Sequence, residues 1–358
     1  MVSMWEGLLS ATGGDLRADK CYWYMIDFKY RAGRWLYKSK SEMPGELTVQ
    51  DNYTIKRLDP WEAEENLGVH LTMTGNWDRQ AEKLQEKAEE FGGKILRGEI
   101  EQKDAWYTFS KAFMPSLRYC MPATSMTLEQ WESILGPALG LALSKLGIVS
   151  KASRKLVFTQ HELQGLGEYH PYFHQYIEHL GISVTETRNF SPTGKSISAL
   201  AEETRRQAGV FGSLAEIPRV ALVWLVTESW LRSLLLFANQ YHIDLVDDGP
   251  QILPKRQNDE ALISRFITQG VSGFQLKQLK DCCDYIGAQT VADVAMFDGK
   301  MLQTSLFSIK IASRRVCANR TEPRQVPIKL LNWQLFVQSL KKFTSLMELI
   351  YVPVLVWT

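Results

Sequence analysis

The sequence of 358 residues predicts an α+β fold, in which a small β-rich N-terminal unit is followed by mainly α-helical domains. Residues 21–30 alternate aromatic or β-branched side chains with other residues, a period typical of a strand. From residue 77 onward, apolar residues recur at steps of three and four, the period of an amphipathic helix. We therefore expect three regions: a β-rich unit over 1–90, a helical region over 91–190 and a helical extension over 191–358.

The β-rich unit is expected to begin with a helix over Met4–Ser10 and a strand over Tyr22–Tyr30. The turn at 31–34 returns the chain as a second strand over Trp35–Tyr37, which makes a hairpin. Three further short strands are expected at Leu47–Val49, Tyr53–Leu58 and Leu67–Leu71.

A helix follows the last of these strands. Asn76 is a favourable N-cap residue, and apolar residues then occur at Trp77, Ala81, Leu84, Ala88 and Phe91. The spacing of 4, 3, 4 and 3 predicts one buried helix face.

In the middle region, apolar residues at 106, 109, 113 and 117 predict a helix whose last turn Pro115 disturbs. Thr127, with Gln130 three residues later, predicts a capping box. We expect Pro137 to stop or kink the helix that follows, with another helix over Leu139–Leu146. Leu156–Phe158 is interpreted as a short β segment.

The segment Phe190–Ser196 contains Pro192 and Gly194 and is predicted to be a linker. Further helices are expected over 198–208, 216–241, 258–269, 275–286 and 333–349. The second of these is nearly all apolar and is expected to form the centre of the C-terminal core. Cys283 lies on the apolar stripe of the fourth and is expected to be buried.

The bulk composition narrows the classes of function. The net charge is +1, from 41 basic and 40 acidic residues, whereas a stand-alone nucleic-acid binder usually has a clear positive excess. Five cysteines without CxxC spacing fit a reducing compartment. We expect no signal peptide and no membrane span, because the longest apolar stretch is interrupted by Glu228 and Arg232. The expected location is intracellular, in the cytoplasm or nucleus.

The order of several short motifs resembles a known family. The motifs are Lys20–Tyr24, Gly33-x-Trp35, Glu62–Glu64, Leu67–Val69 and Gly75-Asn76, followed by Leu117–Thr124, Gly165–Gly167 and Gly270–Asp298. Together they resemble the part of retroelement reverse transcriptases that follows the polymerase palm. The similarity covers most of the chain.

The resemblance implies a set of roles. Leu67, Gly68 and Val69 would occupy the primer grip, the helix from Trp77 would begin the thumb, and Lys20 would correspond to a lysine that approaches nucleotide phosphates. The family places its catalytic aspartates, which hold Mg²⁺, before the primer grip, and nothing in residues 1–60 supplies them. We therefore expect no catalytic residue, no metal ligand and no cofactor in this chain, which alone should be inactive as an RNA-directed DNA polymerase.

The expected partner is an RNA–DNA primer–template, held through its phosphates. The candidate contacts are cationic residues of two groups, Lys83 with Lys87 and Lys151 with Arg154. Glutamates are interleaved with the first group, so an ordinary solvated helix face remains an alternative. The alternative function is a non-enzymatic helical protein-interaction module.

Two other features are weaker candidates. The pair Asp247-Asp248 imitates a metal-binding aspartate hairpin but follows the primer-grip position by about 180 residues, so it is interpreted as a solvated turn. His170 and His174 have a spacing that can hold zinc on a helix. Pro171 places His170 at or before the first helical turn, and a helix with histidines at its edge is the preferred interpretation.

Overall fold

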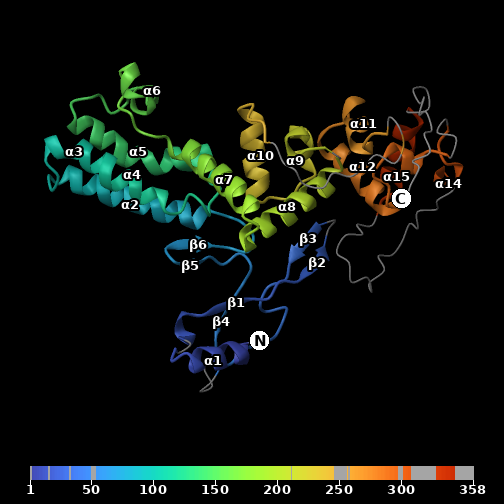
Figure 1. The fold of residues 1–358 in the computed structure, drawn as a ribbon, viewed down its shortest axis with the longest axis horizontal. Helices are drawn as coiled ribbons and strands as arrows, with labels where there is room; N and C mark the ends of the chain where they lie inside the picture. Colours follow the sequence, from blue (N-terminus) through green and yellow to red (C-terminus); the bar gives the residue numbers. More distant parts are fainter. Residues whose placement is uncertain are drawn as a thin grey trace. The chain divides into compact units, whose positions relative to one another are not determined.

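The computed structural model describes residues 2–14, 17–31, 34–49, 54–210, 212–245, 256, 259–296, 301–307 and 328–342. The fold is α+β and mainly helical, as the sequence predicts (Figure 1). The chain divides into two units, Met1–Glu178 and His179–Thr358. The division falls within one helix, α7 (Pro171–Arg188).

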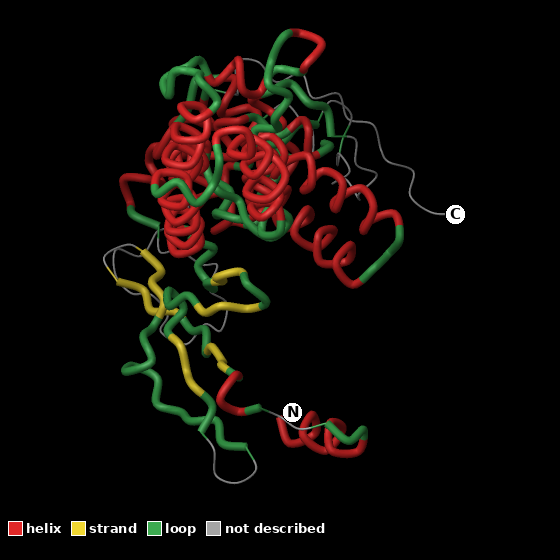
Figure 2. The backbone as a smooth tube through the Cα atoms, turned by 90° about the vertical axis from the view of Figure 1, so that its left-hand side faces the viewer, coloured by secondary structure: helices red, strands yellow, loops and turns green. Residues whose placement is uncertain are grey.

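The strands described in the first unit are short and form three separate two-stranded sheets, drawn in yellow in Figure 2. One sheet is parallel and the other two are antiparallel. The N-terminal elements are α1 (Val2–Ala11), the 3₁₀ turn η1 (Ala18–Lys20), β1 (Tyr22–Tyr24), β2 (Phe28–Arg31), β3 (Arg34–Tyr37), β4 (Lys56–Leu58), β5 (Glu64–Asn66) and β6 (Val69–Leu71).

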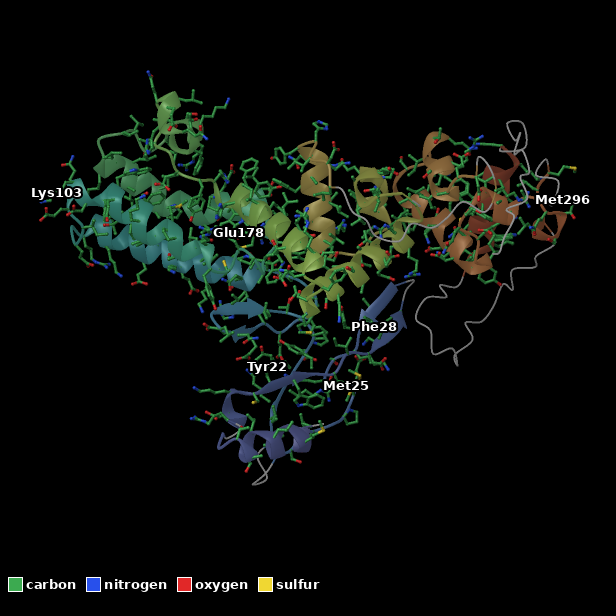
Figure 3. The ribbon with its side chains drawn as sticks, viewed as in Figure 1. Tyr22, Met25, Phe28, Lys103, Glu178 and Met296 are labelled. Carbon is green, nitrogen blue, oxygen red and sulfur yellow. The ribbon has the colours of Figure 1, made fainter. Side chains whose placement is uncertain are left out.

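The predicted strand over Tyr22–Tyr30 is wrong in its continuity, because it is divided into β1 and β2. Figure 3 labels Tyr22, Met25 and Phe28 along this segment. At the break, the carboxylate of Asp27 accepts the N–H of Phe28 at 2.8 Å and binds the ammonium of Lys38. The two halves then pair with different strands, β1 with β4 and β2 with β3. The hairpin of β2 and β3 is confirmed.

Two long helices pack side by side in the helical part of the first unit, α2 (Asp78–Leu96) and α5 (Leu128–Lys145) (Figure 1). Leu84 and Ala88 are on the buried face of α2, as predicted. Asn76 lies one residue before the N-cap, and its side chain accepts the N–H of Asp78 at 2.7 Å. A Cβ at Gly92 would lie 3.0 Å from Cδ1 of Leu141, so the glycine permits the close approach of the two helices.

The predicted helix from Trp106 to Leu117 consists of three pieces. A π-helical turn, η3 (Phe109–Phe113), lies between α3 (Gln102–Thr108) and α4 (Met114–Arg118). Pro115 has no N–H to donate to the preceding turn, which fits a disturbed ladder at this point. Phe109, Phe113 and Leu117 are buried, as expected.

The capping box of Thr127 and Gln130 is confirmed at the start of α5. Pro137 does not stop the helix, and the separate helix predicted over Leu139–Leu146 is wrong, because α5 continues through Pro137 to Lys145. Proline removes one backbone hydrogen bond from a helix, but the buried face of α5 packs against α2 on both sides of it. Tertiary packing therefore outweighs the local penalty.

The predicted β segment Leu156–Phe158 is also wrong, because these residues belong to a short helix, α6 (Arg154–Phe158). The hydroxyl of Ser153 accepts the N–H of Lys155 at 3.3 Å and begins the helix. A 3₁₀ turn, η4 (His161–Leu163), and a glycine turn follow. A Cβ at Gly165 would lie only 2.0 Å from the carbonyl oxygen of Thr159, so this turn requires glycine.

In the second unit, the predicted linker and the predicted long helix are both wrong. The segment Phe190–Ser196 is not a linker, because α8 (Pro192–Ala208) begins inside it with Ser191 as N-cap. The long helix expected over 216–241 is two helices, α9 (Arg219–Trp224) and α10 (Trp230–Gln240), after a 3₁₀ turn, η5 (Leu214–Glu216). The side chain of Ser229 caps α10 by accepting the N–H of Arg232 at 3.2 Å. Because the residues on both sides of the break are apolar, the hydrophobic pattern of the sequence does not indicate where the first helix ends.

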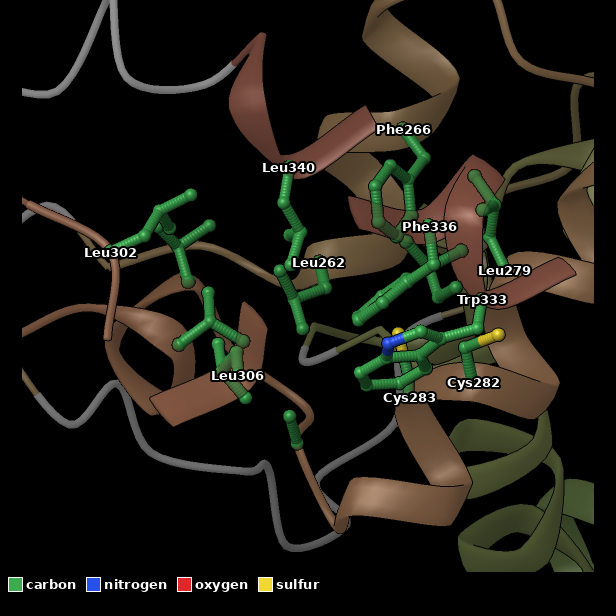
Figure 4. Close-up of a cluster of buried hydrophobic side chains, with 14 of the residues drawn as sticks. Leu262, Phe266, Leu279, Cys282, Cys283, Leu302, Leu306, Trp333, Phe336 and Leu340 are labelled. Atoms are coloured by element: carbon green, nitrogen blue, oxygen red, sulfur yellow. The ribbon is translucent and has the colours of Figure 1, made fainter. Parts of the chain in front are cut away.

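The C-terminal core is a cluster of apolar side chains from several short helices, shown in Figure 4. The rings of Phe266 and Phe336 are 6.1 Å apart, and those of Trp333 and Phe336 are 5.3 Å apart. Cys283 is buried among them, as predicted. The helices are α11 (Leu262–Thr268), α12 (Gly273–Ile286), α13 (Val291–Val294), α14 (Thr304–Phe307) and α15 (Leu330–Lys341).

Within the described residues, no helix has both the length and the apolar character that a bilayer span requires.

Candidate functional site

The hairpin of β5 and β6 carries the residues predicted to form a primer grip. Leu67 and Gly68 form its two-residue turn, with φ values of 50° and 85°. Positive φ at both central positions is typical of tight hairpin turns that match the twist of the strands. Leu67 is 82% exposed at the tip, whereas Val69 is buried. Of the three residues predicted to form the primer grip, Leu67 and Gly68 are therefore accessible to a partner, whereas Val69 is buried and has a packing role.

Two polar contacts hold this hairpin against α2. The N–H of His70 donates to Oε1 of the buried Gln80 at 2.8 Å. The ammonium of Lys83 lies 2.7 Å from the carboxylate of Glu65 and lowers the pKa of that carboxyl. The hairpin is thus fixed on the helix that follows it, rather than extended into solvent.

A hollow of about 460 Å³ lies beside the hairpin, α2 and α4. Three predicted site residues, Gly68, Lys83 and Lys87, line it. A volume of this size is within the range of ligand pockets. The other residues of its wall are Gln80, Leu84, Glu86, Glu90, Ser116, Tyr119 and Cys120.

The glutamates of this wall have cationic partners, whereas one of its lysines has no carboxylate partner in the described part of the chain. Glu90 lies 2.9 Å from Lys94, which lowers the pKa of the glutamate, and Glu86 lies 3.9 Å from Arg79. Lys87 instead donates to the carbonyl oxygen of Ser116 at 3.4 Å. Among the described residues, no carboxylate oxygen lies within 4 Å of its ammonium. Lys87 is therefore the lysine of this wall that is most available to an anionic ligand.

Sequence reasoning did not identify Tyr119 as a site residue. It follows the last residue of α4, about fifty residues after the hairpin, and its side chain is 65% exposed. A Cβ at Gly68 would lie 3.5 Å from Cε1 of Tyr119, so the ring rests against the hairpin turn. The segment Leu117–Thr124 contributed to the family resemblance, but its residue types gave no sign of this contact.

The remaining predicted site residues lie elsewhere. Lys20 is exposed in η1, near the N-terminus. Lys151 and Arg154 are exposed on and before α6, which lies on the other side of α5 from α2 (Figure 1). The structure thus brings Lys83 and Lys87 to one hollow but does not bring Lys151 and Arg154 to it.

The histidines considered for zinc have structural contacts. His170 is the residue before α7, and its Nδ1 accepts the N–H of Tyr172 at 3.2 Å. Burial, reinforced by the charge of Arg154, lowers the pKa of His170 to about 4. His174 lies 3.3 Å from the carboxylate of Glu178, which also binds Arg118. In the part of the chain that is described, no group of three or more His, Cys, Asp or Glu side chains is arranged to hold a metal ion.

The pair Asp247-Asp248 lies outside the described residues. Two buried cysteine thiols have a raised pKa: burial raises the pKa of Cys120, and that of Cys282 to about 12. A thiolate is the reactive form of cysteine, so these two thiols are expected to be inert at neutral pH.

Comparison of the chain with protein-family models, with curated proteins and with solved structures finds no match.

Proposed function

We propose that this chain binds the sugar–phosphate backbone of an RNA–DNA primer–template, as part of a retroelement reverse transcriptase. The turn at Leu67 and Gly68 and the exposed face of α2 would contact the nucleic acid. The observation that carries the proposal is the shared hollow of Gly68, Lys83 and Lys87. The resemblance of the sequence to the family predicts that a primer-grip turn and a thumb helix act together. Gly68 lies in the predicted primer-grip turn, and Lys83 and Lys87 lie on the predicted thumb helix.

The proposed role is binding, not catalysis. No catalytic residue and no Mg²⁺ ligand is part of the proposal, because the resemblance places the aspartates of the family before the primer grip and residues 1–60 do not supply them. Lys151 and Arg154 remain proposed phosphate contacts, for a nucleic acid long enough to reach beyond the hollow. Lysine and arginine contacts of this kind position a duplex and do not read its sequence.

The test is fluorescence anisotropy of a labelled RNA–DNA hybrid with the purified chain, across a series of salt concentrations. Each lost phosphate contact lowers the magnitude of the salt slope by about one. We expect Lys87→Ala to produce this change, whereas Lys277→Ala, which removes an exposed lysine of α12, should leave the slope unchanged. Lys87→Ala is a clearer test than Lys83→Ala, because removal of Lys83 would also take away the ion-pair partner of Glu65.

The second candidate function is a non-enzymatic protein-interaction module. Glu86 and Glu90 line the same hollow as the lysines, and the exposed Leu67 offers an apolar contact. A mixed wall of this type suits a peptide surface as well as a phosphate backbone. Absence of hybrid binding at low salt would contradict the first proposal and favour this one.

A further inference from the structure

The hollow beside the hairpin has a feature that backbone binding does not use. Its wall combines an exposed aromatic ring, Tyr119, with the ammonium of Lys87, and the exposed Leu67 directly precedes the wall residue Gly68. Binding to backbone phosphates depends on cationic side chains and does not require an aromatic ring. An aromatic face beside a cation is instead the combination that binds an unpaired nucleotide, through its base and its phosphate.

We propose that this hollow binds an unpaired nucleotide at the end of a nucleic acid strand, with its base stacked on Tyr119 and its phosphate paired with Lys87. The inference rests on the proposed binding of a primer–template and names the part of the ligand that the hollow takes. It makes Tyr119 a binding residue in addition to those predicted from the sequence.

The contacts on the two sides of the hollow favour this arrangement. The ammonium of Lys87 donates to the carbonyl oxygen of Ser116, three residues before Tyr119, so the cation and the ring lie on neighbouring parts of one wall. The Tyr119 ring lies beside the turn at Gly68, since a Cβ at that glycine would be 3.5 Å from Cε1, and the side chain is 65% exposed. An exposed aromatic ring of this kind can stack on a base.

The charge pattern of the wall is compatible with a phosphate at Lys87. The two wall carboxylates have partners of their own, Arg79 for Glu86 and Lys94 for Glu90. Lys87 has no carboxylate within 4 Å among the described residues, so a phosphate there would not have to displace an existing ion pair. Leu67, at the tip of the hairpin, would contact the last base pair and separate it from the unpaired base.

The experiment compares three labelled RNA–DNA hybrids by anisotropy at one salt concentration: a blunt hybrid, a hybrid with a single unpaired nucleotide at one end, and the same hybrid with an abasic residue at that position. We expect the unpaired nucleotide to tighten binding roughly 5- to 150-fold over the blunt end, the value of one base–aromatic stack. The abasic end keeps the phosphate but lacks the base, and should bind like the blunt end apart from the small effect of one added charge.

Variants locate the effect. Tyr119→Ala should abolish the preference for the unpaired nucleotide and Tyr119→Phe should keep it. Tyr107→Ala removes a tyrosine of similar exposure, 67%, outside the hollow and serves as the matched control. If the blunt hybrid binds with a salt slope that depends on Lys87, but the unpaired nucleotide adds nothing or its effect survives Tyr119→Ala, the inference is wrong and the proposed function stands. If no hybrid binds at low salt, both are wrong.

Discussion

The indole N–H of Trp131 donates a hydrogen bond to Oε1 of Gln175 at 3.3 Å, and both side chains are fully buried. The same oxygen accepts the N–H of Met126 at 3.1 Å and the hydroxyl of Thr124 at 3.2 Å. The amide nitrogen of Gln175 donates in turn to the carbonyl oxygen of Met126 at 3.1 Å. One side chain of α7 thus satisfies three donors and one acceptor of α5 and the segment that precedes it.

Gln175→Leu should therefore destabilise the first unit. The change leaves several buried polar groups without partners, and each costs about 1–3 kcal/mol when it is not compensated. We expect the free energy of unfolding to fall by about 3 kcal/mol in urea titrations followed by tryptophan fluorescence. Gln102→Leu, at an exposed position of α3, is the control and should change it by less than about 0.5 kcal/mol.

Gly194→Ala should destabilise the corner between α7 and α8. A Cβ at Gly194 would lie 2.0 Å from the carbonyl oxygen of Glu186 and 3.0 Å from Cα of Thr187, so the backbone must move. We expect a loss of about 3 kcal/mol in the free energy of unfolding, at the upper end of overpacking effects. In the matched control Gly181→Ala, on α7, nothing lies within 4 Å of the new Cβ. Higher helix propensity should raise stability there by up to about 1 kcal/mol.

Thr127→Ala should weaken α5 at its first turn. The hydroxyl of Thr127 accepts the N–H of Gln130 at 3.2 Å, and the side chain of Gln130 accepts the N–H of Thr127 at 2.9 Å. Loss of the cap should cost about 1 kcal/mol, measured by the urea midpoint. Thr127→Asp keeps an acceptor oxygen and should restore most of this value; equal losses in both variants would contradict a capping role.

The stability of the first unit should decline as the pH falls from about 6.5 toward 4. The folded state lowers the pKa of His170 from its ordinary 6.5 to about 4, so the unfolded chain binds the proton more readily than the folded one. The stabilisation is present above pH 6.5 and is lost across this window. His170→Asn supplies a non-titrating cap for α7, and its unfolding free energy should fall less over the same range. Parallel pH profiles for the two proteins would show that His170 is not the cause.

Leu67→Asn should separate binding from stability. Leu67 adopts a φ of 50°, which is unfavourable for leucine and well tolerated by asparagine. We expect the variant to be as stable as the original chain, or more stable by up to about 1 kcal/mol, and to bind the RNA–DNA hybrid more weakly because the apolar tip is lost. Unchanged affinity would remove Leu67 from the proposed contact surface.

The features that could be predicted from the sequence are those set by neighbouring residues. The cap at Thr127, the buried stripe of α12 and the hairpin of β2 and β3 depend on residues a few positions apart. The features that were missed depend on tertiary packing. α5 continues through Pro137 because α2 covers it, and the break before Ser229 separates two equally apolar segments.

The same division applies to the candidate site. The period of α2 places Lys83 and Lys87 near each other, and the turn at Gly68 precedes that helix, so the sequence could suggest a shared surface. Tyr119 could not be found in this way, because it reaches the hollow from the end of α4. Val69 was assigned to the site through the resemblance alone, and its burial gives it a packing role instead.

The π-helical turn over Phe109–Phe113 has a consequence for insertions and deletions in this chain. Phe109, Phe113 and Leu117 are spaced by four, and each four-residue step advances about 40° beyond a full turn in an α-helix. A wider turn offsets part of this drift and keeps the three side chains on one side. A π-helical turn holds about one residue more than an α-helical turn, so deletion of a single residue within 110–112 would convert it into an ordinary α-helical turn. The apolar side chains on either side of the deletion would then be three residues apart and would stay on one face of the helix. The segment should therefore tolerate the loss of one residue better than the gain of one.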